Sequence, residues 1–130
     1  MTETHFDADL EGGWQLEGKD GRFEPVHLAL GDTEIRRAPL GLTVGRHPKL
    51  CERVVEDPTV SRRHFRIGYA AAGPFIEDLN SLNGTTVDGA LLTPFQPVTL
   101  KAGQTIVAGK VTLTVCRLAS GLGEQGTGEA

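Results

Sequence analysis

Long apolar runs are missing from this chain of 130 residues. No stretch approaches the roughly 18 consecutive apolar residues that a membrane-spanning helix needs, so we expect no insertion into a membrane. Residues 1–7 are polar and partly acidic and lack the apolar segment of a signal peptide, so we expect no secretory signal. These two absences lead us to expect a cytoplasmic protein.

Cysteine is also scarce, with two residues, Cys51 and Cys116, far apart in the chain. They form no C-x-x-C pair, and in a cytoplasmic protein we interpret them as free thiols. His5, His27 and His47 do not combine with Cys51 at the paired spacing of zinc modules. We therefore expect neither a metal nor a cofactor.

An excess of positive charge is absent as well. The chain has 13 Lys and Arg against 17 Asp and Glu, which gives a formal net charge of −4 at pH 7. Affinity for nucleic acid rewards a basic surface, so we do not expect a nucleic-acid-binding protein. Six cations nevertheless fall between positions 46 and 66, either as ordinary solvated charges or as a local field that steers an anionic peptide. They are Arg46, Lys49, Arg53, Arg62, Arg63 and Arg66.

Turn signals, in contrast, are plentiful. Seventeen glycines and seven prolines interrupt the chain so often that long helices have little room. Between these interruptions apolar and polar residues alternate, most clearly at 26–30, 65–69 and 111–115, which is the pattern of half-buried strands. Some ten or eleven short strands, without a convincing amphipathic helix, predict an all-β fold, either a sandwich or a barrel.

Local signals place individual elements. Asp20-Gly21, after a short strand at 14–16, predicts a hairpin, and Asp88-Gly89, after a strand at 85–87, predicts another, because these dipeptides tolerate the positive φ of tight hairpin turns. Residues 33–37 are predicted to form a polar, edge-like strand.

The same pass along the chain gives the domain limits. We place one β-sandwich domain at 13–117, with its core at 26–117 and an additional hairpin near Trp14. A flexible acidic tail is expected at 1–12 and a disordered, glycine-rich tail at 118–130, because both have few apolar side chains to bury.

Three short motifs stand where predicted strands meet turns: Gly45-Arg46, residues 61–64 (Ser-Arg-Arg-His) and residues 78–85 (Asp-Leu-Asn-Ser-Leu-Asn-Gly-Thr). They provide guanidinium, hydroxyl and amide groups, but no activated nucleophile and no paired carboxylates for acid–base catalysis. Such donors suit a phosphate dianion, which carries about −1.5 to −2 charges and three strong acceptor oxygens at pH 7. A guanidinium can donate to two of those oxygens at once.

In this order and at these separations, Gly45-Arg46, Ser61-x-x-His64 and Asn80-Ser81-x-Asn83-Gly84-Thr85 resemble the forkhead-associated (FHA) domain, a phosphothreonine-recognition module. The resemblance covers residues 42–115. It implies a β-sandwich of two twisted, largely antiparallel sheets with the binding loops at one end. It also implies a phosphothreonine-containing protein or peptide as the partner, in Ser/Thr kinase signalling, and a binding module rather than an enzyme.

The resemblance assigns a role to each matching residue. Arg46 and Ser61 are the expected main phosphate contacts, and Arg62 is a further one. Asn83 is expected to hydrogen-bond the ligand backbone, whereas His64 is expected to brace the loops from beneath without touching the ligand. The remaining residues expected to support the site are Gly45, Gly84 and Thr85.

Two residues depart from the family pattern. Leu82 stands where many relatives have threonine, serine or a basic residue that also contacts phosphate, so only its backbone N–H is left to bind a ligand. Arg53 stands where relatives often bury an aliphatic side chain. The first departure keeps an alternative open, namely a scaffold or interaction module of the same fold that binds its partners without phosphate.

Simpler explanations exist for the same residues. Arg46 taken alone is a solvated charge at a strand end. A hydrolase triad of Ser61, His64 and either Asp57 or Asp78 is disfavoured, because the chain has no G-x-S-x-G motif and residues three apart on a strand face opposite sides.

Overall fold

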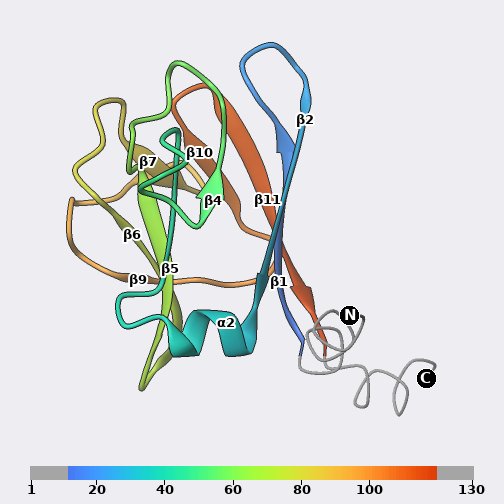
Figure 1. The fold of residues 1–130 in the computed structure, drawn as a ribbon, viewed down its shortest axis with the longest axis vertical. Coiled ribbons are helices and arrows are strands. Elements are labelled where there is room, and N and C mark those ends of the chain that lie inside the picture. Colours follow the sequence, from blue (N-terminus) through green and yellow to red (C-terminus); the bar gives the residue numbers. More distant parts are fainter. Residues whose placement is uncertain (1–11, 120–130) are drawn as a thin grey trace.

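The computed structural model describes residues 12–119, which form eleven strands and one short helix (Figure 1). No helix in this range is long and apolar enough to span a membrane. The predicted tails at 1–12 and 118–130 lie almost entirely outside the described residues. The helix is α2 (Asp32–Arg37). The strands are β1 (Gly13–Lys19), β2 (Pro25–Gly31), β3 (Leu42–Gly45), β4 (Arg53–Val54), β5 (Phe65–Ala70), β6 (Gly73–Asp78), β7 (Thr85–Val87), β8 (Ala90–Leu91), β9 (Val98–Thr99), β10 (Thr105–Ala108) and β11 (Val111–Leu118).

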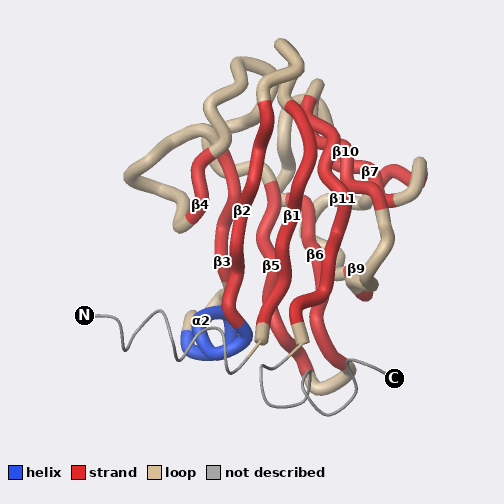
Figure 2. Tube along the Cα trace, turned by 90° about the vertical axis from the view of Figure 1, so that its right-hand side faces the viewer, coloured by secondary structure: helices blue, strands red, loops and turns tan. Residues whose placement is uncertain are grey.

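The strands form two sheets packed face to face. One sheet has the order β2-β1-β11-β10-β7-β8 and the other the order β4-β3-β5-β6-β9. All neighbours are antiparallel except β3 and β4, which run parallel. In Figure 2, β2, β1 and β11 lie in front of β3, β5 and β6. The predicted all-β sandwich with two largely antiparallel sheets is confirmed.

Alternation along the strands builds the core between the sheets. On β11, Val111, Leu113 and Val115 are buried while the threonines between them are exposed. The core also includes Trp14 and Leu16, which lie ahead of the 26–117 stretch to which the sequence assigned it. The reason is that β1 pairs with both β2 and β11, so the hairpin near Trp14 is part of this sheet and contributes to the core.

The predicted strand at 33–37 is wrong, because these residues belong to the helix α2. Asp32 and Glu34 occupy its first turn and Arg36 and Arg37 its last, which matches the helix dipole at both ends. Ile35 is buried against the core. One buried apolar residue in six gives no helical periodicity that sequence analysis can detect.

The Asp32 carboxylate fastens this helix to the sandwich. It is nearly buried and accepts two hydrogen bonds from the Arg117 guanidinium, at 2.7 and 2.8 Å, and one from the Tyr69 hydroxyl at 2.6 Å. Burial raises the pKa of Asp32, but the bonds from Arg117 and Tyr69 outweigh it and the pKa lies below its ordinary value. These partners are distant in sequence, so α2 is held largely by tertiary contacts.

Both predicted hairpins exist, but the first is closed by the longer loop 20–24, whose positive φ of 65° falls on Phe23 and not on Asp20-Gly21. Residues 20–24 connect β1 to β2, and Asp88-Gly89 connects β7 to β8 with positive φ angles of 50° and 84° at the two turn residues. Figure 1 shows that the loops before and after β4, the β6–β7 loop and the β1–β2 hairpin all lie at one end of the sandwich. The α2 helix and the β5–β6 hairpin lie at the opposite end.

Candidate phosphate-binding site

Three loops enclose a hollow of about 650 Å3 at the upper end of the sandwich. They are the β3–β4, β4–β5 and β6–β7 loops, which belong to separate parts of the chain. All five residues predicted to contact a ligand line this hollow. Its lining consists of Arg46, Leu50, Pro58, Thr59, Val60, Ser61, Arg62, Arg63, Asn80, Leu82 and Asn83.

Arg46 follows β3 directly and is held by the β4–β5 loop. Its backbone N–H donates to the Ser61 carbonyl at 2.9 Å, and its Nε donates to the Val60 carbonyl at 2.9 Å. Within residues 12–119 its two terminal nitrogens form no hydrogen bond, and the side chain is exposed. The guanidinium is therefore oriented on one edge while its other donors remain available to an anion.

Ser61 joins two of the loops. Its Oγ accepts a hydrogen bond from the Leu82 backbone N–H at 2.9 Å, which leaves the hydroxyl proton for an external acceptor. The Leu82 side chain is 88% exposed, so it offers neither a polar contact nor a buried apolar one. The Leu82 N–H, which the sequence left as this residue's remaining donor to a ligand, is already used by Ser61.

Asn83 is oriented by the neighbouring β4–β5 loop. Its Nδ2 donates to the Thr59 carbonyl at 2.8 Å, so the amide plane is fixed while Oδ1 and the second N–H can face a ligand. The next residue, Gly84, has a φ of 80°, a backbone conformation that glycine adopts at little cost. Gly84 therefore suits the bend that leads from Asn83 into β7.

His64 is fully buried beneath these loops. Its Nδ1 accepts the Ser61 backbone N–H at 3.0 Å, so its Nε2 carries the proton and donates to the Gly84 carbonyl at 2.9 Å. Burial lowers the pKa of His64 despite the Gly84 carbonyl and the nearby Asp78 carboxylate, so the ring stays neutral. These contacts are the ones that the predicted bracing role requires, and none of them leaves a nitrogen for a ligand.

The same geometry argues against a Ser–His nucleophile. A serine nucleophile needs its hydroxyl hydrogen-bonded to an imidazole nitrogen. Here the imidazole of His64 is bonded to the backbone N–H of Ser61, and the Ser61 hydroxyl is bonded to Leu82.

Gly45 and Thr85 complete the predicted support. A Cβ at Gly45 would collide with the Arg62 carbonyl oxygen, so only glycine lets β3 lie this close to the β4–β5 loop. Thr85 is fully buried, and its hydroxyl donates to the Asp78 carboxylate at 2.7 Å. The Asp78 carboxylate also accepts bonds from the Ser81 hydroxyl at 2.6 Å and the Ser81 N–H at 3.1 Å.

Two buried carboxylates, Asp57 and Asp78, support the loops, although the sequence pointed to them only as candidate triad members. Asp78 is 1% exposed and Asp57 is 3% exposed. Asp57 accepts bonds from the Gly21 N–H, the Thr59 N–H and the Thr59 hydroxyl. The signal was present, because aspartate two or three residues before a serine or threonine in a loop commonly hydrogen-bonds the following backbone.

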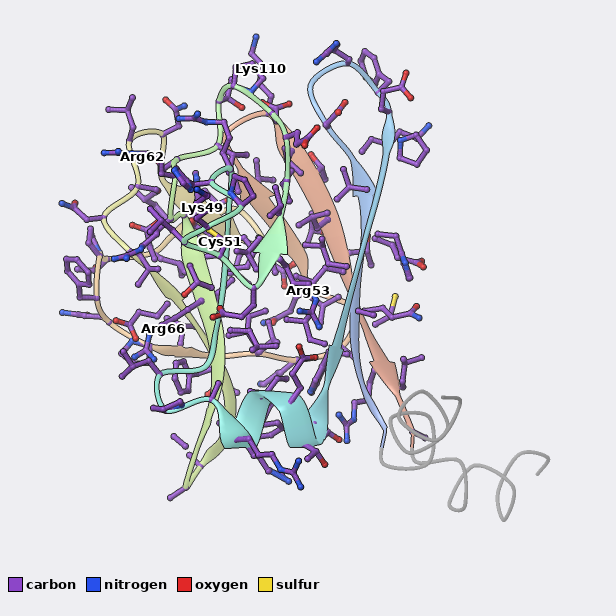
Figure 3. All side chains as sticks on the ribbon, viewed as in Figure 1. Lys49, Cys51, Arg53, Arg62, Arg66 and Lys110 are labelled. Atoms are coloured by element: carbon purple, nitrogen blue, oxygen red, sulfur yellow. The ribbon has the colours of Figure 1, made fainter. Side chains whose placement is uncertain are left out.

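The six cations between 46 and 66 do not form one field. Arg53 donates to the Ala29 and Glu52 carbonyls and to the Glu34 carboxylate at 2.5 Å, which explains how it replaces an aliphatic residue. Arg66 pairs with Glu77 at 2.7 Å. In Figure 3, Arg62 and Lys49 lie among the upper loops, whereas Arg66 lies toward the opposite end. The cations that line the hollow are Arg46, Arg62 and Arg63.

In the described part of the chain, the cysteines and potential metal ligands are not assembled into a site. Cys51 and Cys116 are both free, as predicted. Burial raises the pKa of the Cys51 thiol, which donates to the Arg62 carbonyl at 2.9 Å. Among residues 12–119, no three His, Cys, Asp or Glu side chains lie close enough together to hold a metal ion.

Comparison with known proteins identifies the family. No curated protein matches the chain significantly. Among solved structures, the FHA domain of an Arabidopsis thaliana hypothetical protein is 28% identical and has a TM-score of 0.67, covering 88% of this chain and 92% of that one. A structure from an analysis of phosphothreonine-dependent FHA domain interactions is 30% identical, with a TM-score of 0.57 and coverage of 80% and 95%. The FhaA FHA domain complexed with the intracellular domain of Rv3910 is 29% identical, with a TM-score of 0.56 and coverage of 78% and 98%.

The family model described as FHA domain matches residues 42–109, slightly more than half of the chain. This range contains all three motifs on which the resemblance was based. The chain therefore belongs to the FHA domain family, whose members are protein-interaction modules.

Proposed function

We propose that this chain is a phosphothreonine-dependent protein-binding module, which grips a phosphorylated segment of a partner protein in the hollow at the loop end. The observation that carries the proposal is that Arg46, Ser61 and Asn83 line one hollow, each with a donor turned away from its own loop contacts. The relative from the analysis of phosphothreonine-dependent FHA domain interactions supports a phosphothreonine ligand, and the FhaA FHA domain complexed with an intracellular domain supports a protein partner. A Ser/Thr kinase acting on the partner is then required to create the binding site.

Charge favours this ligand over a neutral one. The free N–H groups of Arg46 share the rim with Arg62 and Arg63, and none of the Asp and Glu residues between 12 and 119 lines the hollow. Each charge-assisted hydrogen bond contributes roughly 1.5–3 kcal/mol. Two or three of them, together with hydrogen bonds to the ligand backbone and less the cost of association, are consistent with micromolar binding at about −8 kcal/mol.

Asn83 is positioned to recognise the backbone of the ligand, which contacts to the phosphate group alone do not. With Nδ2 held by Thr59, its remaining amide groups can bind the ligand backbone and so fix the register of the peptide. The Arg46 and Ser61 side chains then meet the phosphate of one residue only.

The alternative is a scaffold of the same fold that binds partners without phosphate. The observation that favours it is Leu82, which is 88% exposed. At this position of the rim the chain has an apolar side chain and no side-chain hydrogen-bond donor. This alternative predicts equal affinity for phosphorylated and unphosphorylated partners.

Titration calorimetry with a degenerate phosphothreonine peptide library, and with its unphosphorylated counterpart, separates the two candidates. We expect binding of the phosphorylated library only. Arg46→Ala should weaken it by about 2 kcal/mol, roughly thirtyfold, while the fold is kept. Arg37→Ala, which removes an exposed cation from α2 at the opposite end, is the matched control and should leave the affinity unchanged. Equal binding of both libraries, or parental affinity in Arg46→Ala, would contradict the proposal.

A further inference from the structure

Asp57 has a buried carboxylate. The residue lies next to Pro58, which lines the hollow, but Asp57 itself does not line it. Three donors converge on the carboxylate: the Gly21 N–H at 2.7 Å, the Thr59 N–H at 2.8 Å and the Thr59 hydroxyl at 2.5 Å. Burial acts to raise the pKa of Asp57, but the bonds from Thr59 and Gly21, with the Lys110 charge, outweigh it and lower the pKa below its ordinary value. The group is therefore an ionised acceptor inside the loop end.

The segment that Asp57 organises carries the ligand-facing side chains. Besides the two bonds from Thr59, the Asp57 backbone carbonyl accepts the Val60 N–H at 3.0 Å, so residues 57–60 form a closed turn. The carbonyl of Thr59 holds the Asn83 amide at 2.8 Å, and the carbonyl of Val60 holds the Arg46 Nε at 2.9 Å. The Arg46 and Asn83 side chains thus both donate to backbone carbonyls that lie within three residues of Asp57.

The turn is itself anchored to the other sheet. The Gly21 N–H comes from the β1–β2 hairpin, and the Thr59 hydroxyl accepts the Lys110 N–H from the β10–β11 turn at 2.8 Å. Figure 3 shows Lys110 at the same end of the molecule as Arg62. Two connections of one sheet therefore position a loop of the other, although neither Gly21 nor Lys110 lines the hollow.

We propose that Asp57 is a positioning residue for phosphopeptide binding, which sets the Asn83 amide and the Arg46 guanidinium through the carbonyls of Thr59 and Val60. This inference rests on the proposed function. A carboxylate is required, because three N–H and O–H donors need acceptors on both of its oxygens. An asparagine offers one acceptor oxygen and turns an NH2 group toward a donor, so at least one of the three bonds is lost.

The test compares Asp57→Asn with a matched control, Asp32→Asn. Asp32 is also a buried carboxylate with three side-chain donors, but it lies at the opposite end of the sandwich. The full chain is titrated with the tightest phosphothreonine peptide from the library, well below the melting temperature of every variant. We expect both variants to lose stability. Asp57→Asn should weaken the peptide tenfold or more, whereas Asp32→Asn should stay within twofold of the parent.

A second readout needs no ligand. The side-chain amide resonances of Asn83 and the Nε resonance of Arg46 should shift in unliganded Asp57→Asn and stay in place in Asp32→Asn. These shifts test the positioning even if no phosphopeptide binds the parent, in which case the proposed function fails separately. Unshifted resonances with parental affinity, or equal weakening in both variants, would overturn the inference.

If Asp57→Asn does not fold, Thr59 provides the same test with a smaller change. Thr59→Val removes the hydroxyl that donates to Asp57 and accepts from Lys110, while Thr59→Ser keeps it. We expect Thr59→Val to shift the Asn83 amide further than Thr59→Ser does, and to weaken the peptide severalfold more. Identical behaviour of the two variants would contradict the inference.

Discussion

Replacement of His64 by alanine tests whether the loop end is held from beneath. The ring is completely buried and each nitrogen has one backbone partner, the Ser61 N–H and the Gly84 carbonyl. The alanine side chain can bond neither group. The variant therefore combines two orphaned backbone groups with a cavity the size of an imidazole.

The magnitude follows from these losses. Each orphaned buried group costs about 1–3 kcal/mol, and truncation of a large buried side chain to alanine adds about 2 kcal/mol or more. We expect His64→Ala to lower the free energy of unfolding by about 4 kcal/mol, a large part of the roughly 5–15 kcal/mol available to a domain. At about 4 °C per kcal/mol for a domain of this size, the melting temperature should fall by about 15 °C.

The dependence on pH gives an independent check. Burial lowers the pKa of His64 in the folded state below its ordinary value of 6.5. Below pH 6.5 the unfolded chain therefore binds a proton that the folded protein does not. The contribution of His64 to stability is complete above pH 6.5 and is lost as the pH falls through that value toward the folded-state pKa.

Chemical denaturation of the parent and His64→Ala at a series of pH values between 8 and 5 measures both effects. The difference in unfolding free energy between the two proteins should shrink as the pH falls, because only the parent carries this titration. A melting temperature within about 2 °C of the parent would refute the bracing role. A difference that stays constant across the whole pH range would refute the argument that the ring is held neutral.

The remaining predictions concern the rim and the glycines. Leu82→Thr should strengthen phosphopeptide binding about threefold to tenfold by adding a hydroxyl donor beside Ser61, as calorimetry can measure, and an unchanged affinity would show that position 82 lies outside ligand reach. Gly109→Ala should destabilise the fold by about 2 kcal/mol or more, because its φ is 62° and the new Cβ would overlap the Thr59 backbone and hydroxyl. Gly89→Ala, with a φ of 84° but open space around it, is the control and should cost only about 1 kcal/mol of unfolding free energy.

Patterns that act locally were sufficient to predict most of the fold. The alternation at 111–115 follows directly from burial on one face, and Asp88-Gly89 makes a two-residue turn because both positions need a positive φ. Sheet order could not be predicted in the same way. β1 is an interior strand because Gly13 pairs with Leu118, more than a hundred residues away, and nothing in residues 13–19 encodes that pairing.

The helix α2 was missed for a related reason. Its stability comes from Asp32, which bonds Tyr69 and Arg117, and from one apolar contact through Ile35. Local propensity over six residues is too weak to outweigh a polar pattern that also fits an edge strand.

The site shows the same division between local motif and distant support. Arg46, Ser61 and Asn83 were predicted together because their motifs resemble those of one family, and they do line one hollow. Asp57 was predicted only as a triad candidate, because the Gly21 and Lys110 contacts that define its surroundings lie 36 and more residues away. Arg53 and Arg66 were included in a steering field because sequence cannot show that their guanidinium groups are bonded to Glu34 and Glu77.

The loop end gains its stiffness from backbone acceptors rather than from strands. Exposed side chains on loops normally lose rotamer freedom when a ligand binds, at about 0.5–1.5 kcal/mol for each immobilised side chain. Arg46 and Asn83 are already restrained by the Val60 and Thr59 carbonyls, so much of that loss is incurred on folding. It follows that buried acceptors such as Asp57 should influence affinity although they never meet the ligand. The Leu82 side chain reaches the hollow without such a restraint, since it is 88% exposed. It should therefore contribute less to the free energy of binding than its position at the rim indicates.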